Sequence, residues 1–255
     1  MSKIAKTKTL HKRNLHNTRY DFQKLINSLP ELQEYVKENS YGDISIDFAS
    51  SDAVLSLNKA LLKYFYRIDW FMPKTYLCPP VPGRVDYIHY IADLLSSSNK
   101  ATIPKGASVK ALDIGVGANC IYPILGNRSY GWQFIGSEIN TISYENARNI
   151  INANVLLKDK ITIIPQISKE NIFKNIIKKD DRLDFTMCNP PFHKSKEEAE
   201  AGSLRKIQNL SKRKNKKLSL NFGGQYNELC YEGGEVEFIS KMIKESVLYK
   251  KNCLW

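Results

Sequence analysis

An apolar run and a rigid turn meet in Asp184-Phe185-Thr186-Met187-Cys188-Asn189-Pro190-Pro191-Phe192. The apolar run is typical of a buried strand, and the strand must end at the two prolines because they donate no ladder hydrogen bonds. Proline also restricts the residue before it to extended conformations, which fixes the directions of the Asn189 and Pro190 carbonyls. Together with the Asn189 amide oxygen, these carbonyls predict a small array of acceptors beneath the ring of Phe192.

Such an array suits a planar group that carries an exocyclic NH2, and adenine, cytosine or a glutamine amide would each fit. The nitrogen lone pair of such a group is delocalised, so the nitrogen is a poor nucleophile. Acceptors aimed at its two hydrogens favour a pyramidal nitrogen and stabilise the positive charge that develops as a methyl group arrives. We therefore predict Asn189, Pro190, Pro191 and Phe192 as catalytic residues. The alternative is an ordinary strand-ending turn with a core phenylalanine.

The composition narrows the class of protein. A chain of 255 residues accommodates one large α/β domain with an extension, or two smaller domains. Its five cysteines are scattered and form no CxxC pair, which fits reduced thiols in a cytoplasmic protein and argues against a metal site. The sequence has no 18-residue apolar run and no signal-peptide pattern, which argues against a membrane protein. The net charge of +12 indicates a polyanionic partner, most simply nucleic acid.

Residues 1–20 are basic and contain no acidic side chain. We predict a flexible RNA-binding arm that becomes ordered on phosphates, with contacts from Lys12, Arg13 and Arg19. An ordinary disordered tail is the alternative.

Residues 21–100 are predicted to form a helical extension. Apolar residues recur at helical spacing across residues 21–37, where Pro30 interrupts the pattern. A longer helix is predicted across residues 52–70, with Asp52 as its N-cap.

Arg84 follows a proline-rich loop and precedes a helix predicted across residues 85–95. A guanidinium beside a pocket can bind a carboxylate through two parallel hydrogen bonds. The alternative is a hydrated surface arginine.

A strand and a glycine-rich turn are predicted at residues 110–117. Gly115 and Gly117 let the backbone approach a ligand closely. Glu138 ends the next predicted strand, 25 positions after Asp113, which is the usual place for a carboxylate that binds ribose hydroxyls. The turn lacks the third glycine of a dinucleotide fingerprint and suits the Asp-x-Gly-x-Gly pattern of enzymes that use S-adenosylmethionine. We therefore predict these four residues as cofactor-binding.

The predicted strands and helices alternate through the second half of the chain: strand 132–137, helix 141–154, strand 161–164, helix 169–178 and strand 184–188. This alternation predicts a parallel sheet with its ligand at the carboxyl ends of the strands. The glycine turn, Glu138 and Asn189 all fall at such ends, which favours a site for a cofactor and an NH2 group over the turn-only alternative.

A polar segment follows Phe192 and covers residues 193–217. We predict a mobile lid that closes over RNA, and a solvated linker is the alternative. Its predicted RNA contacts are Arg205, Lys206, Lys212, Arg213 and Lys214. A helix is predicted after it, across residues 236–249.

Five motifs carry a resemblance to a known family: Leu10-His11-Lys12-Arg13-Asn14, PPVPGRVDYIHYI (79–91), DIGVGANCIYP (113–123), CNPPFH (188–193) and NFGGQYNELCYEGGEVEFI (221–239). The chain resembles the RlmF family of bacterial 23S rRNA adenine N6-methyltransferases and their eukaryotic methyltransferase-like relatives. The resemblance implies a class I methyltransferase fold that uses S-adenosylmethionine, with a Rossmann-like, mostly parallel sheet and helices on both faces.

The resemblance also implies roles for individual residues. Asn189 and Pro190 would hold the target amine while Phe192 stacks on the base. Arg84 would bind the cofactor carboxylate, and Ser168 would lie near the cofactor adenine. The implied partner is 23S rRNA or a ribosome assembly intermediate. The protein is expected to be a monomer in the cytoplasm.

The methyltransferase domain is predicted to cover residues 101–255. A class I fold has seven strands, and residues 252–255 would open the fifth, so we expect an incomplete sheet whose fourth strand has an exposed edge. Two alternative functions remain: an RNA-binding protein with an inactive fold, or methylation of DNA adenine or protein glutamine.

Overall fold

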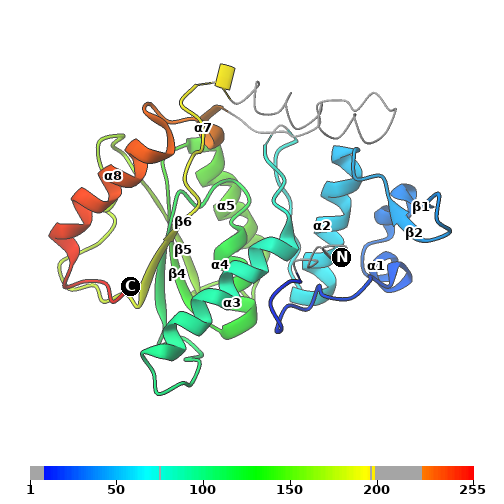
Figure 1. Cartoon of the computed structure of the whole chain (residues 1–255), viewed down its shortest axis with the longest axis horizontal. Helices are drawn as coiled ribbons and strands as arrows, with labels where there is room; N and C mark the ends of the chain where they lie inside the picture. The colour runs from blue at the N-terminus through cyan, green and yellow to red at the C-terminus, as the bar shows by residue number, and fades with distance from the viewer. Residues whose placement is uncertain (1–8, 75, 196, 199–225) are drawn as a thin grey trace, which may run out of the picture.

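The structure is a computed structural model that describes residues 9–74, 76–195, 197–198 and 226–255 (Figure 1). Its centre is a four-stranded parallel sheet of order β5-β4-β3-β6. The strands are β3 (Lys110–Ile114), β4 (Gln133–Glu138), β5 (Ile161–Pro165) and β6 (Phe185–Cys188). The predicted parallel sheet is confirmed, and β6 ends directly before the Asn-Pro-Pro turn.

Helices cover both faces of the sheet. On one face lie α3 (Val81–Ser97), α4 (Ile121–Tyr130) and α5 (Thr141–Ala153), and on the other lies α8 (Gly234–Ser246) with η2 (Val247–Tyr249) (Figure 1). Residues 111–114 of β3 are continuously buried, as expected for a parallel strand between two layers. This arrangement confirms the predicted class of fold.

The outer edge of β6 is partly paired. Leu183 N–H donates to Asn252 O at 2.7 Å, and Thr186 N–H donates to Trp255 O at 2.9 Å. Leu183 and Cys253 form a parallel bridge. The expected exposed edge is therefore wrong for residues 183–186, because residues 252–255 lie beside them as the opening of a fifth strand would.

The extension before the sheet contains α1 (Phe22–Ser28), η1 (Pro30–Tyr35), β1 (Val36–Glu38), β2 (Ile44–Ile46), and α2 (Ser51–Tyr66). The predicted break at Pro30 is confirmed, whereas the hairpin β1–β2 was not predicted. The predicted cap of α2 is wrong: Ser50 is the N-cap and its side chain accepts from Ala53 N–H, so Asp52 lies inside the first turn. One hydrophobic core joins this extension to the sheet, since Leu61 and Phe134 belong to the same buried cluster.

The helix predicted across residues 169–178 does not form. The Glu245 carboxylate of α8 accepts from the backbone N–H groups of Ile172, Phe173 and Lys174 at 2.6, 3.0 and 2.8 Å. Gln166 Nε2 donates to the carbonyls of Ile172 and Lys174. These side chains satisfy the backbone groups that a helix would otherwise satisfy, so the apolar residues pack on the sheet as a series of turns.

Residues 9–20 are folded against α2 and α3. His11 is buried, its N–H donates to Asp86 at 2.9 Å, and its ring lies 3.0 Å from an Asp93 oxygen. Asn14 is also buried and donates to Pro82 O at 2.9 Å and to Asp86 at 2.5 Å. The expected flexible arm is therefore wrong for residues 9–20, because acidic side chains far along the chain bind them. Residues 1–8 lie outside the described part.

No helix in the described ranges is long and apolar enough to cross a membrane.

Two buried histidines predict that stability depends on pH. Burial lowers the pKa of His16 and His89 from 6.5 to about 4, and nearby positive charge adds to the effect. The unfolded chain therefore binds protons below pH 6.5 that the folded chain does not bind until about pH 4. We expect the free energy of unfolding to fall as the pH drops through this window.

Urea titrations of the wild type and of a His16→Gln variant at several pH values test this expectation. The quantity compared is the slope of the free energy of unfolding against pH. Because the carboxyl groups of both proteins titrate alike, the difference between the two slopes is the contribution of His16. Parallel pH profiles for the two proteins would contradict the expectation.

Candidate active site at the carboxyl ends of the strands

The glycine turn after β3 is bound directly to the carboxylate that ends β4. Gly115 and Gly117 have φ angles of +68° and +67°, which side-chain-bearing residues rarely adopt. Gly117 N–H donates to Glu138 Oε2 at 2.8 Å, while Oε1 accepts from the N–H groups of Ile139 and Asn140 at 2.9 and 2.8 Å. Three backbone donors therefore orient the Glu138 carboxylate beside the turn.

Asp113 lies below the same turn and is 1% exposed. Its Oδ2 has no hydrogen-bond partner among the described residues. Burial and the charge of Glu138 raise the pKa of Asp113 well above its usual value, while the charge of Arg84 opposes this shift. Burial also raises the pKa of Glu138, although its three backbone donors act in the opposite direction. Perturbed, incompletely bonded buried carboxylates are typical of a ligand site.

These features fit S-adenosylmethionine. The molecule carries an ammonium group and ribose hydroxyls that can donate to carboxylates, and its carboxylate needs a cationic partner. Acceptors are present on Asp113 and Glu138, and Arg84 supplies the cation. Apart from Gly115 and its two chain neighbours, no atom of the described residues lies within 4 Å of the position where a side chain on Gly115 would begin, so this part of the chain leaves room for a ligand.

The Asn-Pro-Pro turn meets Arg84 and a tyrosine that sequence reasoning missed. Arg84 Nη1 donates to Asn189 Oδ1 at 2.9 Å and to Tyr122 Oη at 2.5 Å. The guanidinium carbon lies 5.4 Å from the centre of the Tyr122 ring. The three side chains come from α3, α4 and the end of β6. Tyr122 lies only five residues after Gly117 in the motif DIGVGANCIYP, which was the available signal.

Phe192 lies at the surface beyond the turn and is 50% exposed. Directly after it, His193 N–H donates to Leu229 O and Tyr231 N–H donates to His193 O, both at 3.0 Å. The chain thus returns to the same place before α8 begins. The predicted lid residues Arg205, Lys206, Lys212, Arg213 and Lys214 lie outside the described residues.

Comparison with known proteins identifies the family. Residues 4–255 match a family described as RNA methyltransferase. The chain is 53% identical over 247 residues to ribosomal RNA large subunit methyltransferase F of Cytophaga hutchinsonii. The alignment covers 96% of this chain and 77% of the relative. The chain belongs to the RlmF family. Ribosomal RNA large subunit methyltransferase F of Bacteroides fragilis is 51% identical to this RlmF-family chain. The alignment covers 99% of this chain and 85% of the relative.

Solved structures agree with this assignment. The catalytic domain of hMettl16 in complex with the MAT2A 3'UTR hairpin 1 superposes with a TM-score of 0.79 at 30% identity, over 96% of this chain and 79% of that one. The N-terminal domain of human METTL16 in complex with SAH has a TM-score of 0.71 at 28% identity, over 96% and 81%. The RlmF-family chain therefore has the fold of S-adenosylmethionine-dependent methyltransferases.

The loop after β5 contains Ser168, and its assignment stays a prediction. Gln166 N–H donates to Glu138 O at 2.8 Å, which places this loop beside the end of β4. The buried Gln166 side chain accepts from Ser168 N–H at 3.1 Å. The Ser168 hydroxyl oxygen accepts from Asn171 Nδ2 at 3.0 Å. Gln166, which sequence reasoning missed, therefore fixes the backbone of the loop.

The predicted RNA contacts near the N-terminus differ in how freely they face solvent. Arg13 donates to Asp93 at 2.7 Å, to His89 O at 2.8 Å and to Tyr130 Oη at 3.0 Å, so its guanidinium is bound within the fold. Lys12 is exposed, and Arg19 is exposed although it pairs with Asp43. RNA contact by Lys12, Arg13 and Arg19 stays a prediction.

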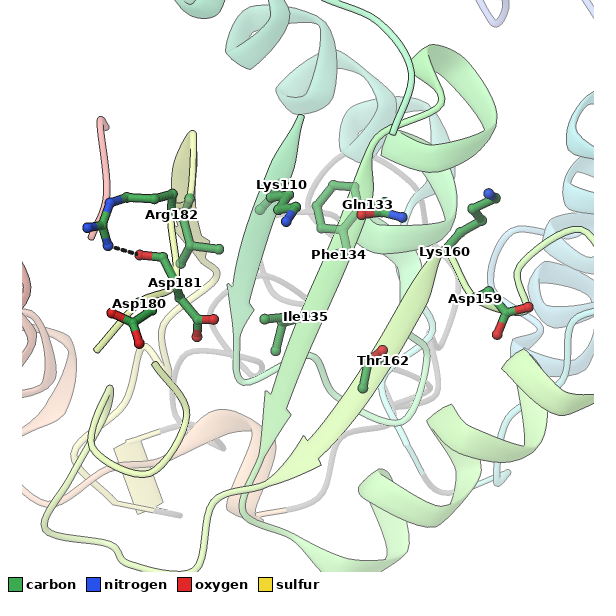
Figure 2. Close-up of a pocket in the computed structure, with 12 residues that line it drawn as sticks. Lys110, Gln133, Phe134, Ile135, Asp159, Lys160, Thr162, Asp180, Asp181 and Arg182 are labelled. Carbon is green, nitrogen blue, oxygen red and sulfur yellow. Dashed lines mark hydrogen bonds between the residues drawn. The ribbon is translucent and has the colours of Figure 1, made fainter. Parts of the chain in front are cut away.

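A cavity of about 360 Å³ lies at the opposite end of the sheet (Figure 2). Lys110, Gln133 and Lys160 lie where β3, β4 and β5 begin, and Arg182 lies just before β6. In a parallel sheet the ligand binds at the other end of the strands, so this cavity is not the candidate active site.

The bonds around Glu138 predict a specific loss on substitution. Glu138→Ala removes the carboxylate that accepts from the glycine turn and that is predicted to accept from the ribose hydroxyls. We expect the dissociation constant of S-adenosylmethionine to rise about tenfold or more, because hydrogen bonds to a charged group are each worth roughly 1.5–3 kcal/mol.

Isothermal titration calorimetry measures this constant. Glu145→Ala is the matched control, since Glu145 is exposed on the neighbouring helix α5. An unchanged constant in Glu138→Ala would contradict the assignment.

Proposed function

We propose that this RlmF-family chain transfers a methyl group from S-adenosylmethionine to N6 of an adenine in large-subunit (23S) ribosomal RNA. Family membership supports the cofactor, the reaction and the class of RNA. The observation that supports the site most directly is the position of Asn189. It follows β6 directly, next to the glycine turn that follows β3, and its side-chain oxygen accepts a hydrogen bond from Arg84. Bound S-adenosylmethionine supplies an electrophilic methyl group on a positively charged sulfur.

In this proposal the target adenine is swung out of its stack into the site. The Asn189 side-chain oxygen and the Pro190 carbonyl accept the two hydrogens of N6. They hold the nitrogen in a pyramidal geometry and stabilise its positive charge as the new N–C bond forms and the S–C bond breaks. N6 then loses one proton to water. The half-exposed ring of Phe192 stacks on the base, and Pro191 stiffens the turn.

The remaining site residues hold the cofactor. Glu138 accepts the ribose hydroxyls, Arg84 binds the carboxylate, and Asp113 faces the ammonium group. The backbone of Gly115 and Gly117 lies against the methionine portion. Ser168 lies near the adenine.

RNA binding is proposed for two groups of basic residues. Lys12, Arg13 and Arg19 near the N-terminus contact phosphates, and so do the five predicted cations of the proposed lid at residues 193–217, which lie outside the described residues: Arg205, Lys206, Lys212, Arg213 and Lys214. The substrate is 23S rRNA or a ribosome assembly intermediate, and the protein acts as a monomer in the cytoplasm. Residues 21–100 form the extension and residues 101–255 the methyltransferase domain.

Replacing Asn189 tests the proposal. In Asn189→Ala the amine loses one acceptor, so we expect methyl transfer to fall at least about a hundredfold, while the affinity for S-adenosylmethionine changes little. Incorporation of labelled methyl groups into 23S rRNA that lacks the modification measures the first quantity, and calorimetry measures the second. Asn152→Ala, at an exposed position of α5, is the control.

Equal losses of transfer and cofactor affinity would contradict the role of Asn189. A wild-type chain that binds the RNA without methylating it would instead support the RNA-binding alternative.

A further inference from the structure

Arg84 lies between the proposed amine acceptor, Asn189, and the proposed position of the cofactor carboxylate. Its Nη1 carries two hydrogens, and both are used, one by Tyr122 Oη at 2.5 Å and the other by Asn189 Oδ1 at 2.9 Å. Tyr122 is 7% exposed, so its bond to Arg84 is shielded from water. The nitrogen that binds the amine acceptor is therefore anchored on its other side by a buried hydroxyl.

The other edge of the guanidinium remains available. Arg84 Nε is buried and has no hydrogen-bond partner among the described residues. A buried N–H without a partner is costly, which indicates that a ligand satisfies it. Nε and Nη2 together form the fork that binds a carboxylate through two parallel hydrogen bonds. Arg84 can thus bind the cofactor carboxylate without releasing Asn189.

The bond from Arg84 also decides which end of the Asn189 amide faces the target. An amide oxygen and an amide nitrogen have nearly the same shape, but only the oxygen accepts a hydrogen bond. Arg84 is only a donor, so it selects the oxygen as its partner. The oxygen has a second lone pair, which remains for the target amine.

Tyr122 restrains Arg84 in two ways. Its hydroxyl accepts from Nη1, and its ring lies beneath the guanidinium at 5.4 Å. Tyr87 packs edge-on against the Tyr122 ring at 5.4 Å, which fixes the ring plane. Removal of the hydroxyl alone would leave the ring contact but free the planar guanidinium to shift, which would carry Nη1 away from Asn189.

We propose that Tyr122 is a positioning residue that, through Arg84, directs the Asn189 oxygen toward the target amine and couples it to the cofactor carboxylate. The proposal rests on the proposed function of the site. Because the cofactor carboxylate further restrains Arg84, cofactor binding strengthens the binding of the target adenine, and the coupling is reciprocal.

Tyr122→Phe tests the proposal because it keeps the ring and removes only the hydroxyl. We expect kcat for methylation of 23S rRNA to fall about tenfold to a hundredfold, with the cofactor dissociation constant and the melting temperature nearly unchanged. Tyr144→Phe is the matched control: Arg148 lies over the Tyr144 ring at 5.4 Å on α5, outside the site, and this variant should keep the wild-type kcat.

A binding experiment separates the positioning role from a purely structural one. S-adenosylhomocysteine should tighten the binding of wild-type protein to the RNA, as measured by fluorescence anisotropy, and this effect should be lost in Tyr122→Phe. A Tyr122→Phe variant with kcat within about twofold of the wild type would overturn the proposal. So would a parallel loss of kcat, cofactor affinity and melting temperature. If the wild-type chain does not methylate the RNA, the proposed function itself fails.

Discussion

The register between β3 and β6 is the constraint on which the site depends. Ile114 pairs with Cys188, so the glycine turn and the Asn-Pro-Pro turn leave the sheet from directly opposite residues. On the other side of β3, Ile114 pairs with Ser137, which places Glu138 beside the same turn. A slip of one residue in either pairing would point the side chains to the wrong face and separate the cofactor turn from the amine acceptor.

Internal hydrogen bonds then fix the polar groups that these strands bring together. Glu138 accepts from three backbone donors, Asn189 accepts from Arg84, and Arg84 is bound by Tyr122. Groups that are already oriented need no reorganisation when charge develops, which is the main way that such sites accelerate a reaction. Two buried atoms of the site, Asp113 Oδ2 and Arg84 Nε, have no hydrogen-bond partner in the part of the chain that the structure describes, and a ligand there would complete the network.

Local patterns predicted the sheet and most of the residues assembled around it. The glycine turn, the acidic residue after the second strand and the proline turn each have a signature within a few residues, because their backbone conformation demands those residue types. The features that were not predicted depend on distant partners. Glu245 binds the backbone of Ile172 from 73 residues away, and His11 binds Asp86 from 75 residues away. Tyr122 was missed for the same reason, since its role depends on Arg84 of another helix.

The most direct test compares two RNAs that differ only in the amine of the target base. Once the methylated adenine is mapped, purine riboside replaces it, and the binding of both RNAs to the wild type and to Asn189→Ala is measured. If Asn189 accepts from the amine, removing the amine should weaken binding to the wild type by about tenfold and should weaken binding to Asn189→Ala clearly less, because only the Pro190 carbonyl still accepts from the amine in that variant. An equal penalty in both proteins would contradict the account.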